Sequence, residues 1–252
     1  MKKVEYAKVI SNTELKPGIF DMRLRAPFMS ASCAPGQFVM VYTGSERHML
    51  PRPISVCGAD KAAGELRIVF KVVGAGTELF SRLHGGATLR VLGPLGNGFP
   101  VCAGKRAALI GGGIGVPPLL ALHKGLSGPC VVFLGDRDAP ILAEEFMGAD
   151  VHLASDSGQT GFHGTAVELA REIDPHVEVI YACGPKPMLR AVAEWAEEKK
   201  IPAYLSMEER MACGIGACVG CAVGIDRGSG PENLKVCKDG PVFLASEVIF
   251  DD

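Results

Sequence analysis

The sequence predicts a chain of three parts: an N-terminal antiparallel β-barrel, a parallel α/β domain, and a C-terminal segment that binds a metal cluster. Three observations carry this prediction. Short β-branched or alternating runs fill the N-terminal part, apolar runs then alternate with helical stretches, and four cysteines gather near the C-terminus. We expect the three parts to span residues 1–100, 101–206 and 207–252.

Six runs in the first part either alternate with a period of two or are rich in β-branched residues, as strands are. The run from Ile19 to Ala26 alternates cleanly, with apolar residues on one face and charged residues on the other. Turn-forming residues separate the runs, which is typical of an antiparallel barrel. We expect one helix around Thr77 to Leu83 and a domain boundary within Pro94 to Lys105. The six runs are residues 4–10, 19–26, 36–43, 52–59, 65–73 and 88–95.

The second part repeats a unit of apolar strand followed by helix. Strands and helices that alternate at this length indicate a parallel sheet covered on both faces. The third part is short, so we expect it to pack on the second part. The predicted strands are residues 107–112, 130–135, 150–155 and 177–184, and the predicted helices are residues 117–126, 141–147, 165–173 and 185–200.

The third part contains the most specific pattern of the chain. Cys213, Cys218 and Cys221 have the spacing C-x4-C-x2-C, and Cys237 follows in a later segment. Four thiolates on this spacing are typical of a plant-type [2Fe–2S] centre, and the glycines between them suit a loop that wraps closely around inorganic sulfide. A structural zinc site and two disulfides are the alternatives, although zinc ribbons favour two short C-x2-C pairs.

Composition excludes several classes of function. The net charge of −2 gives no electrostatic footprint for nucleic acid. The longest apolar stretch is interrupted by glycines and two prolines, so we expect no membrane span. The chain has nine cysteines and its first residues do not read as a secretory signal, which favours a reducing compartment, the cytoplasm, and thiol or metal chemistry.

Two glycine-rich corners lie at strand ends in the second part. The first, Gly111-Gly112-Gly113-Ile114-Gly115, connects a strand to a helix, where backbone N–H groups can face a pyrophosphate. Val116 stands where the pattern G-x-G-x-x-G requires its last glycine, so a plain tight turn is the alternative. The second corner, Ala182-Cys183-Gly184-Pro185-Lys186-Pro187-Met188, ends a later strand of the same sheet. Because ligands bind across the carboxyl ends of parallel strands, the two corners support each other.

In the barrel, two short segments could hold a phosphate or a planar ring. The first is Arg52-Pro53-Ile54-Ser55, and the second runs from Val69 to Thr77 and includes Gly74 and Gly76. An arginine at a strand start can bind a phosphate, and a small turn rich in N–H donors suits a diphosphate. Taken alone, neither segment indicates a site, because an arginine on a strand is usually a solvated charge and a Gly-x-Gly-Thr segment is usually a loop.

The order of these motifs along the whole chain resembles the ferredoxin reductase superfamily, in which a flavin-binding barrel precedes a pyridine-nucleotide domain. The strings EERMACGIGACVGCAV and KVCKDGPVF are more specific. They look like the electron-transfer subunits of NAD-dependent, class 1B dihydroorotate dehydrogenases. This resemblance implies an electron-transfer role in pyrimidine biosynthesis, with FAD and a [2Fe–2S] cluster as cofactors and NAD as electron acceptor.

The resemblance also implies roles for individual positions. Many reductases of the superfamily carry Tyr at the position of Ile54, so aromatic stacking on the flavin is absent there. The implied FAD-binding residues are Arg52, Pro53, Ile54, Ser55, Val69, Phe70, Lys71, Gly76 and Thr77, and the implied cluster ligands are Cys213, Cys218, Cys221 and Cys237. Gly111, Gly112, Gly113 and Gly115, together with Cys183, Gly184 and Pro185, would flank the nicotinamide nucleotide.

No acid–base pair for oxidising a substrate is visible, so we expect no catalytic residue in this chain. In the family it resembles, a partner subunit binds FMN and the pyrimidine, and the two assemble as a heterotetramer with two copies of each. Asp136 would repel the 2′-phosphate of NADP whereas Arg137 could attract it, and we favour NAD. The alternatives are a small flavin and iron–sulfur subunit of an NAD(P)H:ferredoxin oxidoreductase or a sulfide dehydrogenase, an oxygenase reductase, and a zinc-stabilised nucleotide-binding module without redox activity.

Overall fold

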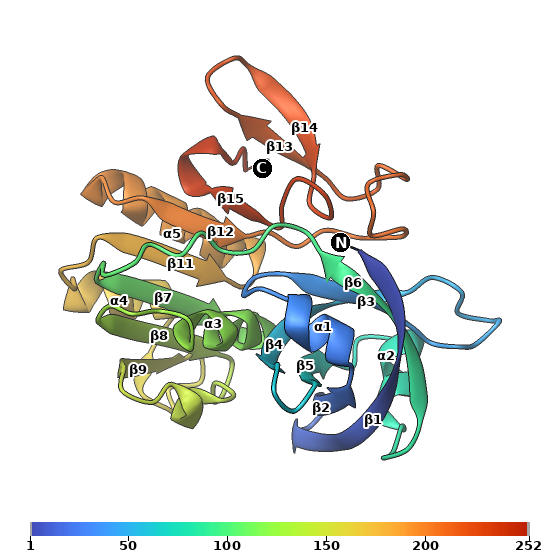
Figure 1. Ribbon diagram of the computed structural model, residues 1–252. Coiled ribbons are helices and arrows are strands. Elements are labelled where there is room, and N and C mark those ends of the chain that lie inside the picture. The colour runs from blue at the N-terminus through green and yellow to red at the C-terminus, as the bar shows by residue number, and fades with distance from the viewer. Residues whose placement is uncertain (1, 251–252) are drawn as a thin grey trace.

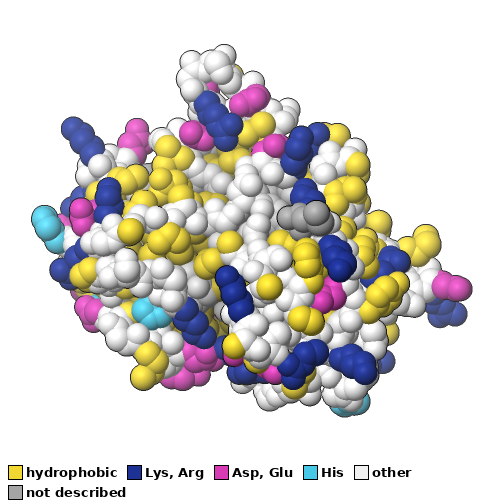
Figure 2. All heavy atoms as spheres, viewed as in Figure 1, with side chains coloured by type: hydrophobic (Ala, Val, Ile, Leu, Met, Phe, Trp, Pro, Cys, Tyr) yellow, Lys and Arg dark blue, Asp and Glu magenta, His cyan; other side chains and the backbone are white. Residues whose placement is uncertain are grey.

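The computed structural model describes residues 2–250, which form a barrel, an α/β sheet and a C-terminal segment that lies against both (Figure 1). Basic and acidic side chains are interspersed over the face seen in Figure 2, and neither kind gathers into a large patch there. Among the described residues, no helix has both the length and the apolar character needed to cross a membrane.

The six-stranded antiparallel barrel predicted from the sequence is confirmed. Its strands close in the order β1-β2-β5-β4-β3-β6 and enclose one apolar core that contains Met22, Leu66 and Ile68. The strands are β1 (Lys3–Lys16), β2 (Ile19–Arg25), β3 (Phe38–Tyr42), β4 (Arg52–Asp60), β5 (Glu65–Lys71) and β6 (Thr88–Leu95).

Two helices accompany the barrel. The predicted helix is present as α2 (Ala75–Ser81), which begins two residues earlier than expected. The other, α1 (Pro27–Ser32), was not predicted because it is only six residues long and has no apolar period. Glu5 on β1 accepts hydrogen bonds from the backbone N–H groups of Phe28 and Met29, both at 3.0 Å, which satisfies two free donors of its first turn. Met29 is thereby fully buried in the barrel core.

The α/β part is a seven-stranded sheet in the order β10-β9-β8-β7-β11-β12-β15, and all strands except β15 run parallel. One face packs on α3 and the other on α4 and α5, so the predicted two-sided cover is confirmed. The strands are β7 (Ala107–Gly112), β8 (Cys130–Asp136), β9 (Asp150–Ser155), β10 (Phe162–His163), β11 (Val179–Cys183), β12 (Ala203–Ser206) and β15 (Val242–Leu244), and the helices are α3 (Val116–His123), α4 (Ala166–Ile173) and α5 (Lys186–Lys199).

The prediction of a helix over residues 141–147 is wrong. Only a single 3₁₀ turn, η2 (Ala143–Glu145), forms there, and Leu142 before it adopts a left-handed φ of 59°. Phe146 is buried, and Glu145 is bound by a barrel arginine, Arg67, so that both residues are fixed by tertiary contacts. These contacts outweigh the weak helical preference of so short a segment.

The C-terminal segment packs on the second part, as expected, and also on the barrel. Its strand β15 pairs with β12 and extends the sheet, whereas the hairpin of β13 (Ala222–Asp226) and β14 (Pro231–Lys235) projects beyond the sheet (Figure 1). On the barrel side, a Cβ at Gly214 would overlap the side chain of Met40. Asn97, just after the barrel, donates its N–H to Gly240 O at 2.6 Å.

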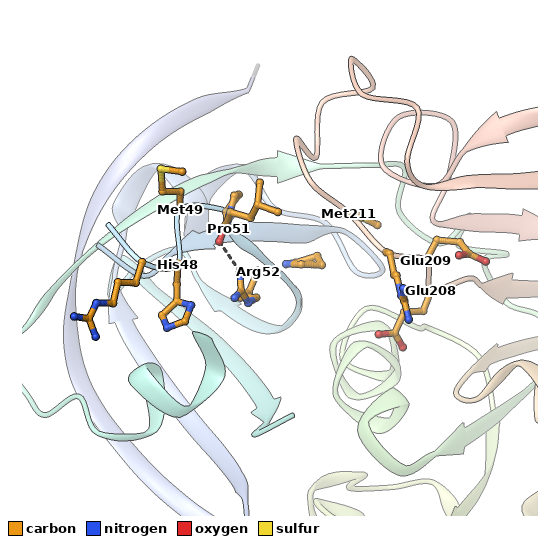
Figure 3. A pocket seen from close by; sticks show the side chains of 11 residues that line it. His48, Met49, Pro51, Arg52, Glu208, Glu209 and Met211 are labelled. Carbon is orange, nitrogen blue, oxygen red and sulfur yellow. Dashed lines mark hydrogen bonds between the residues drawn. The ribbon is translucent and has the colours of Figure 1, made fainter. Parts of the chain in front are cut away.

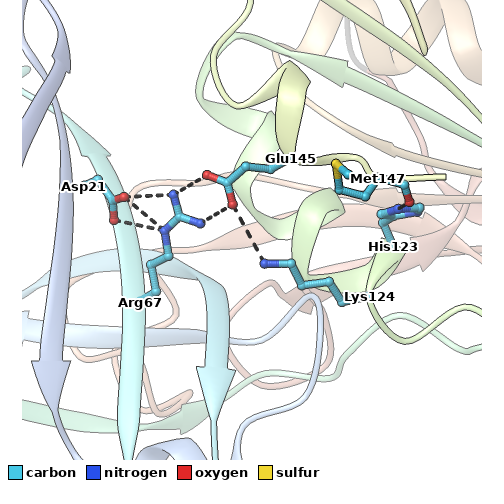
Figure 4. A network of polar contacts seen from close by, with 6 residues as sticks. All are labelled: Asp21, Arg67, His123, Lys124, Glu145 and Met147. Carbon is cyan, nitrogen blue, oxygen red and sulfur yellow. Dashed lines mark hydrogen bonds and ion pairs between the residues drawn. The ribbon is translucent and has the colours of Figure 1, made fainter. Parts of the chain in front are cut away.

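Charged side chains join the barrel to the α/β sheet at two places. Arg67 on β5 forms paired hydrogen bonds with Asp21 on β2 and with Glu145, at distances of 2.6–3.1 Å, and Lys124 lies 3.9 Å from the same glutamate (Figure 4). Lys16, the last residue of β1, donates to Asp136 on β8 at 2.7 Å. Both pairs join residues distant in the sequence and fix how the barrel meets the sheet.

Candidate functional site

Arg52 and Gly76 belong to separate barrel motifs, and the structure brings them together. Arg52 begins β4 and lies against Gly76 in the first turn of α2. A Cβ at Gly76 would overlap the Arg52 guanidinium, so glycine at this position leaves room for the guanidinium to lie against the turn. The guanidinium donates to Leu50 O at 2.5 Å. A guanidinium beside the N–H groups of a turn is a suitable cradle for a diphosphate.

Thr77 is buried, and its hydroxyl is used within the same turn. The hydroxyl donates to Gly74 O at 2.9 Å and accepts from the N–H groups of Val73 and Gly74, at 2.9 and 3.3 Å. The side chain therefore caps α2. A contact between Thr77 and a diphosphate stays a prediction, and it would use the backbone N–H.

The other predicted flavin residues divide between two faces of their strands. Ile54 on β4 and Phe70 on β5 lie in the barrel core, where Phe70 packs against Phe20 and Phe80. Val69 belongs instead to the core that the barrel shares with α3. Because side chains alternate along a strand, Pro53 and Ser55 lie on the face of β4 opposite Ile54. Lys71 is exposed at the strand end.

A cleft of about 870 Å³ separates the barrel from the chain that leads into the cysteine loop (Figure 3). Arg52 and Pro53 line it on the barrel side, and Glu209 and Met211 line it on the opposite side. The loop before β4 completes the lining with residues that we did not single out from the sequence, among them Arg47, His48, Met49 and Leu50. Only their closeness to Arg52 in the sequence could have indicated them.

The two glycine corners meet at the carboxyl edge of the sheet. Cys183 pairs in register with Gly111, and β7 and β11 are neighbours from which the chain continues in opposite directions across the sheet. A Cβ at Gly115 would overlap the carbonyl of Cys183, and one at Gly112 would contact Pro185 at 3.0 Å. The glycines therefore allow the corners to touch at the switch point where dinucleotides bind in such sheets.

The four predicted ligand cysteines come from two segments that the hairpin brings together. Cys221 and Cys237 are buried, Cys213 is half-buried and Cys218 is exposed. The N–H of Cys237 donates to Cys221 Sγ at 3.5 Å, and Cys213 Sγ accepts from the N–H groups of Ile215 and Cys218, at 3.5 and 3.4 Å. Backbone donors aimed at sulfur suit thiolate ligands, whose negative charge they stabilise.

Hydrogen bonds and burial shift the pKa values of two of these thiols in opposite directions. Burial would raise the pKa of Cys213, but the N–H groups of Ile215 and Cys218 outweigh it and lower that pKa to about 6. Burial and the neighbouring Cys221 thiol raise the pKa of Cys237 to about 12. Among residues 2–250, no three His, Cys, Asp or Glu side chains stand close enough to hold a metal ion without adjustment, and all nine cysteines are free thiols. The donor set fits an iron–sulfur cluster, whose thiolate ligands must be deprotonated.

The fold and the site together define an oxidoreductase of the ferredoxin reductase type, in which a barrel and a nucleotide-binding sheet carry an additional iron–sulfur segment. Residues 4–99 match the oxidoreductase FAD-binding domain. Residues 208–249 match the iron–sulfur cluster binding domain of dihydroorotate dehydrogenase B. All four ligand candidates lie within the second match.

The chain belongs to the family of dihydroorotate dehydrogenase B (NAD(+)) electron transfer subunits. It is 41% identical to the member from Bacillus caldolyticus over 97% of this chain and 98% of that one. The members from Streptococcus mutans and Listeria monocytogenes are 40% and 42% identical over 98% and 96% of this chain, and 98% and 97% of their own lengths.

Solved structures agree with this fold. A chain of the NADH-dependent reduced ferredoxin-NADP oxidoreductase, studied for flavin-based electron bifurcation, superimposes with a TM-score of 0.87 and 26% identity, over 97% of this chain and 90% of that one. The ferredoxin reductase of carbazole 1,9a-dioxygenase superimposes with a TM-score of 0.68 and 24% identity, over 81% and 69% of the two chains. At that identity, the second likeness concerns the fold alone.

Proposed function

We propose that this chain is the electron-transfer subunit of a dihydroorotate dehydrogenase, and that it passes electrons from an FMN-containing catalytic partner to NAD+ through a [2Fe–2S] cluster and FAD. The observation that carries this proposal is the cleft between Arg52 and Met211. Met211 lies two residues before Cys213, so a flavin beside Arg52 and a cluster at Cys213 would be close neighbours. Electron transfer requires such a short path.

The cofactors would supply different chemistry: NAD+ takes two electrons as hydride, an iron–sulfur cluster moves one at a time, and a flavin does both. The chain's own residues bind and orient. Arg52 and the Gly76–Thr77 turn would hold the FAD diphosphate, and Pro53 and Ser55, on the outer face of β4, would flank the isoalloxazine. Cys213, Cys218, Cys221 and Cys237 would ligate the cluster.

The nicotinamide nucleotide would bind along the joined glycine corners. Gly111 to Gly115 would face its pyrophosphate, and Cys183 to Pro185 would border the nicotinamide. Close packing of Gly115 on the Cys183 carbonyl supports this placement, because it fixes the two corners relative to each other. No residue here is assigned an acid–base role, since dihydroorotate oxidation would occur on the partner.

The cluster loop offers an exposed face to that partner. Ile215 and Val219 are 47% and 55% exposed, and Cys218 beside them is also exposed, whereas Cys221 and Cys237 face inward. We therefore place the catalytic subunit against this loop. The resemblance noted from the sequence favours two copies of each subunit, and nine free thiols favour a cytoplasmic setting.

A second candidate is the small flavin and iron–sulfur subunit of an NAD(P)H:ferredoxin oxidoreductase. The superposition with the reduced ferredoxin-NADP oxidoreductase favours it. Identities of 40–42% with dihydroorotate dehydrogenase B electron transfer subunits, over nearly the whole of both chains, favour the first candidate.

The two candidates predict different partners for the same chain. The test measures dihydroorotate-dependent NAD+ reduction by the FAD- and iron-loaded chain, alone and with an FMN-bearing dihydroorotate dehydrogenase subunit. We expect NADH oxidation with an artificial acceptor from the chain alone, and dihydroorotate oxidation only after the partner is added. Dihydroorotate oxidation by the chain alone, free of FMN protein, would contradict the proposal. Electron transfer between NAD(P)H and ferredoxin, with no dihydroorotate oxidation in the presence of the FMN subunit, would favour the second candidate.

A further inference from the structure

Asp136 lies at the end of the second strand of the sheet, where a residue can contact the adenosine ribose of a bound dinucleotide. It is the last residue of β8. The neighbouring strand, β7, leads at its carboxyl end into the Gly111–Gly115 turn. In sheets of this type, an acidic residue after the second strand accepts a hydrogen bond from the ribose 2′-hydroxyl, and a nearby cation accommodates the 2′-phosphate of NADP. This placement rests on the nucleotide site proposed above.

The carboxylate of Asp136 does not stand alone there. Its Oδ2 atom accepts from Lys16 Nζ at 2.7 Å, and its Oδ1 atom accepts from the Arg137 N–H at 2.7 Å. Lys16 comes from the barrel, and its ammonium also donates to Ala139 O at 3.0 Å. The Lys16 and Asp136 side chains are 29% and 13% exposed, so both hold their positions at the edge of solvent.

The pair changes the electrostatics of the ribose subsite. A carboxylate alone would repel a 2′-phosphate, but here a fixed ammonium lies in direct contact with that carboxylate, and the exposed Arg137 side chain follows it. With Asp136 present, the ammonium is neutralised by the carboxylate. Without Asp136, an ammonium already anchored at Ala139 O would have no anionic partner in this pair and would be free to bind a phosphate.

We propose that Lys16 is a specificity-determining residue for the dinucleotide. Its ammonium could bind the 2′-phosphate of NADP, but Asp136 holds it in an ion pair. This pair, which joins the barrel to the α/β sheet, would set the preference for NAD over NADP. The barrel then does more than bind flavin, because it contributes a charge to the nucleotide subsite. Asp136 in turn acts on NADP in two ways, by repelling the phosphate and by retaining the cation that would bind it.

The proposal predicts that the effects of the two residues depend on each other. Asp136→Ala should raise NADP+ affinity about tenfold to a hundredfold, the range that one charge-assisted hydrogen bond gives. In the Lys16→Met background the same change should raise it less than about threefold, because only the repulsion is removed. Lys16→Met alone should not improve NADP+ binding. Lys8→Met, an exposed lysine on the same strand, is the matched control and should leave the gain of Asp136→Ala intact.

The measurement is isothermal titration of the FAD- and iron-loaded chain with NAD+, NADP+ and 2′-AMP, which reads binding without turnover. Asp136→Asn, which preserves size and an acceptor for the Arg137 N–H, is the second variant should Asp136→Ala fail to fold. A gain for NADP+ and 2′-AMP that requires Lys16 and weakens with added salt supports the proposal. An equal gain with and without Lys16, or no gain, overturns it. If the unaltered chain binds neither NAD+ nor 2′-AMP, the nucleotide site itself is refuted, which is a separate outcome.

Discussion

Replacing Arg67 tests most directly how the barrel and the α/β sheet are held together. Replacing it by Met removes one guanidinium that lies between Asp21 and Glu145 and is only 11% exposed. Both carboxylates would then lose their paired hydrogen bonds, and Asp21, at 13% exposed, would be left mostly buried without its partner. Removing one member of a buried ion pair costs ~3–5 kcal/mol, because the remaining charge is neither paired nor hydrated.

The lower end of that range applies, since the Glu145 side chain is 31% exposed and water can partly replace the arginine. We therefore expect Arg67→Met to lower the free energy of unfolding by about 3 kcal/mol. In a chain of this size that is a fall in Tm of roughly 6–12 °C. The assay is urea and thermal unfolding followed by circular dichroism, at matched cofactor content.

The matched control is Arg82→Met, since Arg82 is 71% exposed and pairs with Glu78 along α2. An exposed pair contributes ~0–1 kcal/mol, so this variant should unfold nearly as the unaltered chain does. If the Arg67 and Arg82 variants lose similar stability, the buried ion pairs of Arg67 do not hold the barrel against the sheet, and the prediction is refuted.

Glu145 adds a dependence on pH to the same test. The hydrogen bonds from Arg67 outweigh burial and hold the pKa of Glu145 below its ordinary range. A lowered folded-state pKa gives stability that is complete above the ordinary glutamate pKa and is lost as the pH falls through the lower value. The loss of stability in Glu145→Gln should therefore be largest at neutral pH and shrink in acid.

Three further predictions concern the proposed cofactor sites. Cys237→Ser should lower the iron content and bleach the visible absorption of the cluster, whereas Cys33→Ser should change neither; a normal cluster in the Cys237 variant would require another fourth ligand. Arg52→Ala should weaken FAD binding by about tenfold to a hundredfold, since it removes a charge-assisted hydrogen bond worth ~1.5–3 kcal/mol, and titration of the deflavinated chain measures it. Gly115→Ala should cost ~1–3 kcal/mol of stability through overlap with the Cys183 carbonyl and should weaken NAD+ binding without affecting FAD; retention of normal NAD+ affinity would remove the corner from the site.

The barrel could be predicted from local patterns because each strand either alternates or is rich in β-branched residues, and turn-forming residues separate the strands. The helix α1 could not, since its first turn depends on Glu5, which lies more than twenty residues earlier. The prediction of a helix around Glu145 was wrong for a related reason. Its sequence fits a helix, but Arg67 from the barrel and the buried Phe146 fix it as a 3₁₀ turn.

The candidate site divides in the same way. The cysteine spacing and each glycine corner could be found in the sequence because each is a short local pattern, whereas their roles as cluster ligands and nucleotide site stay predictions. The loop from Arg47 to Leu50 could not, since nothing in it indicates that the chain after β12 lies opposite. Lys16 also lacked any local signal. Its contact with Asp136 spans 120 residues and exists only because the end of β1 meets the end of β8.

The pairing of β15 with β12 has a consequence for the order in which a nascent chain can complete its sheet. Val242 to Leu244 follow all four predicted ligand cysteines in the sequence, yet they cover the edge left by residues 203–206. During synthesis from the N-terminus, that edge stays unpaired until Cys237 has been added. A molecule whose sheet is complete therefore already contains all four cysteines that are predicted to bind the cluster.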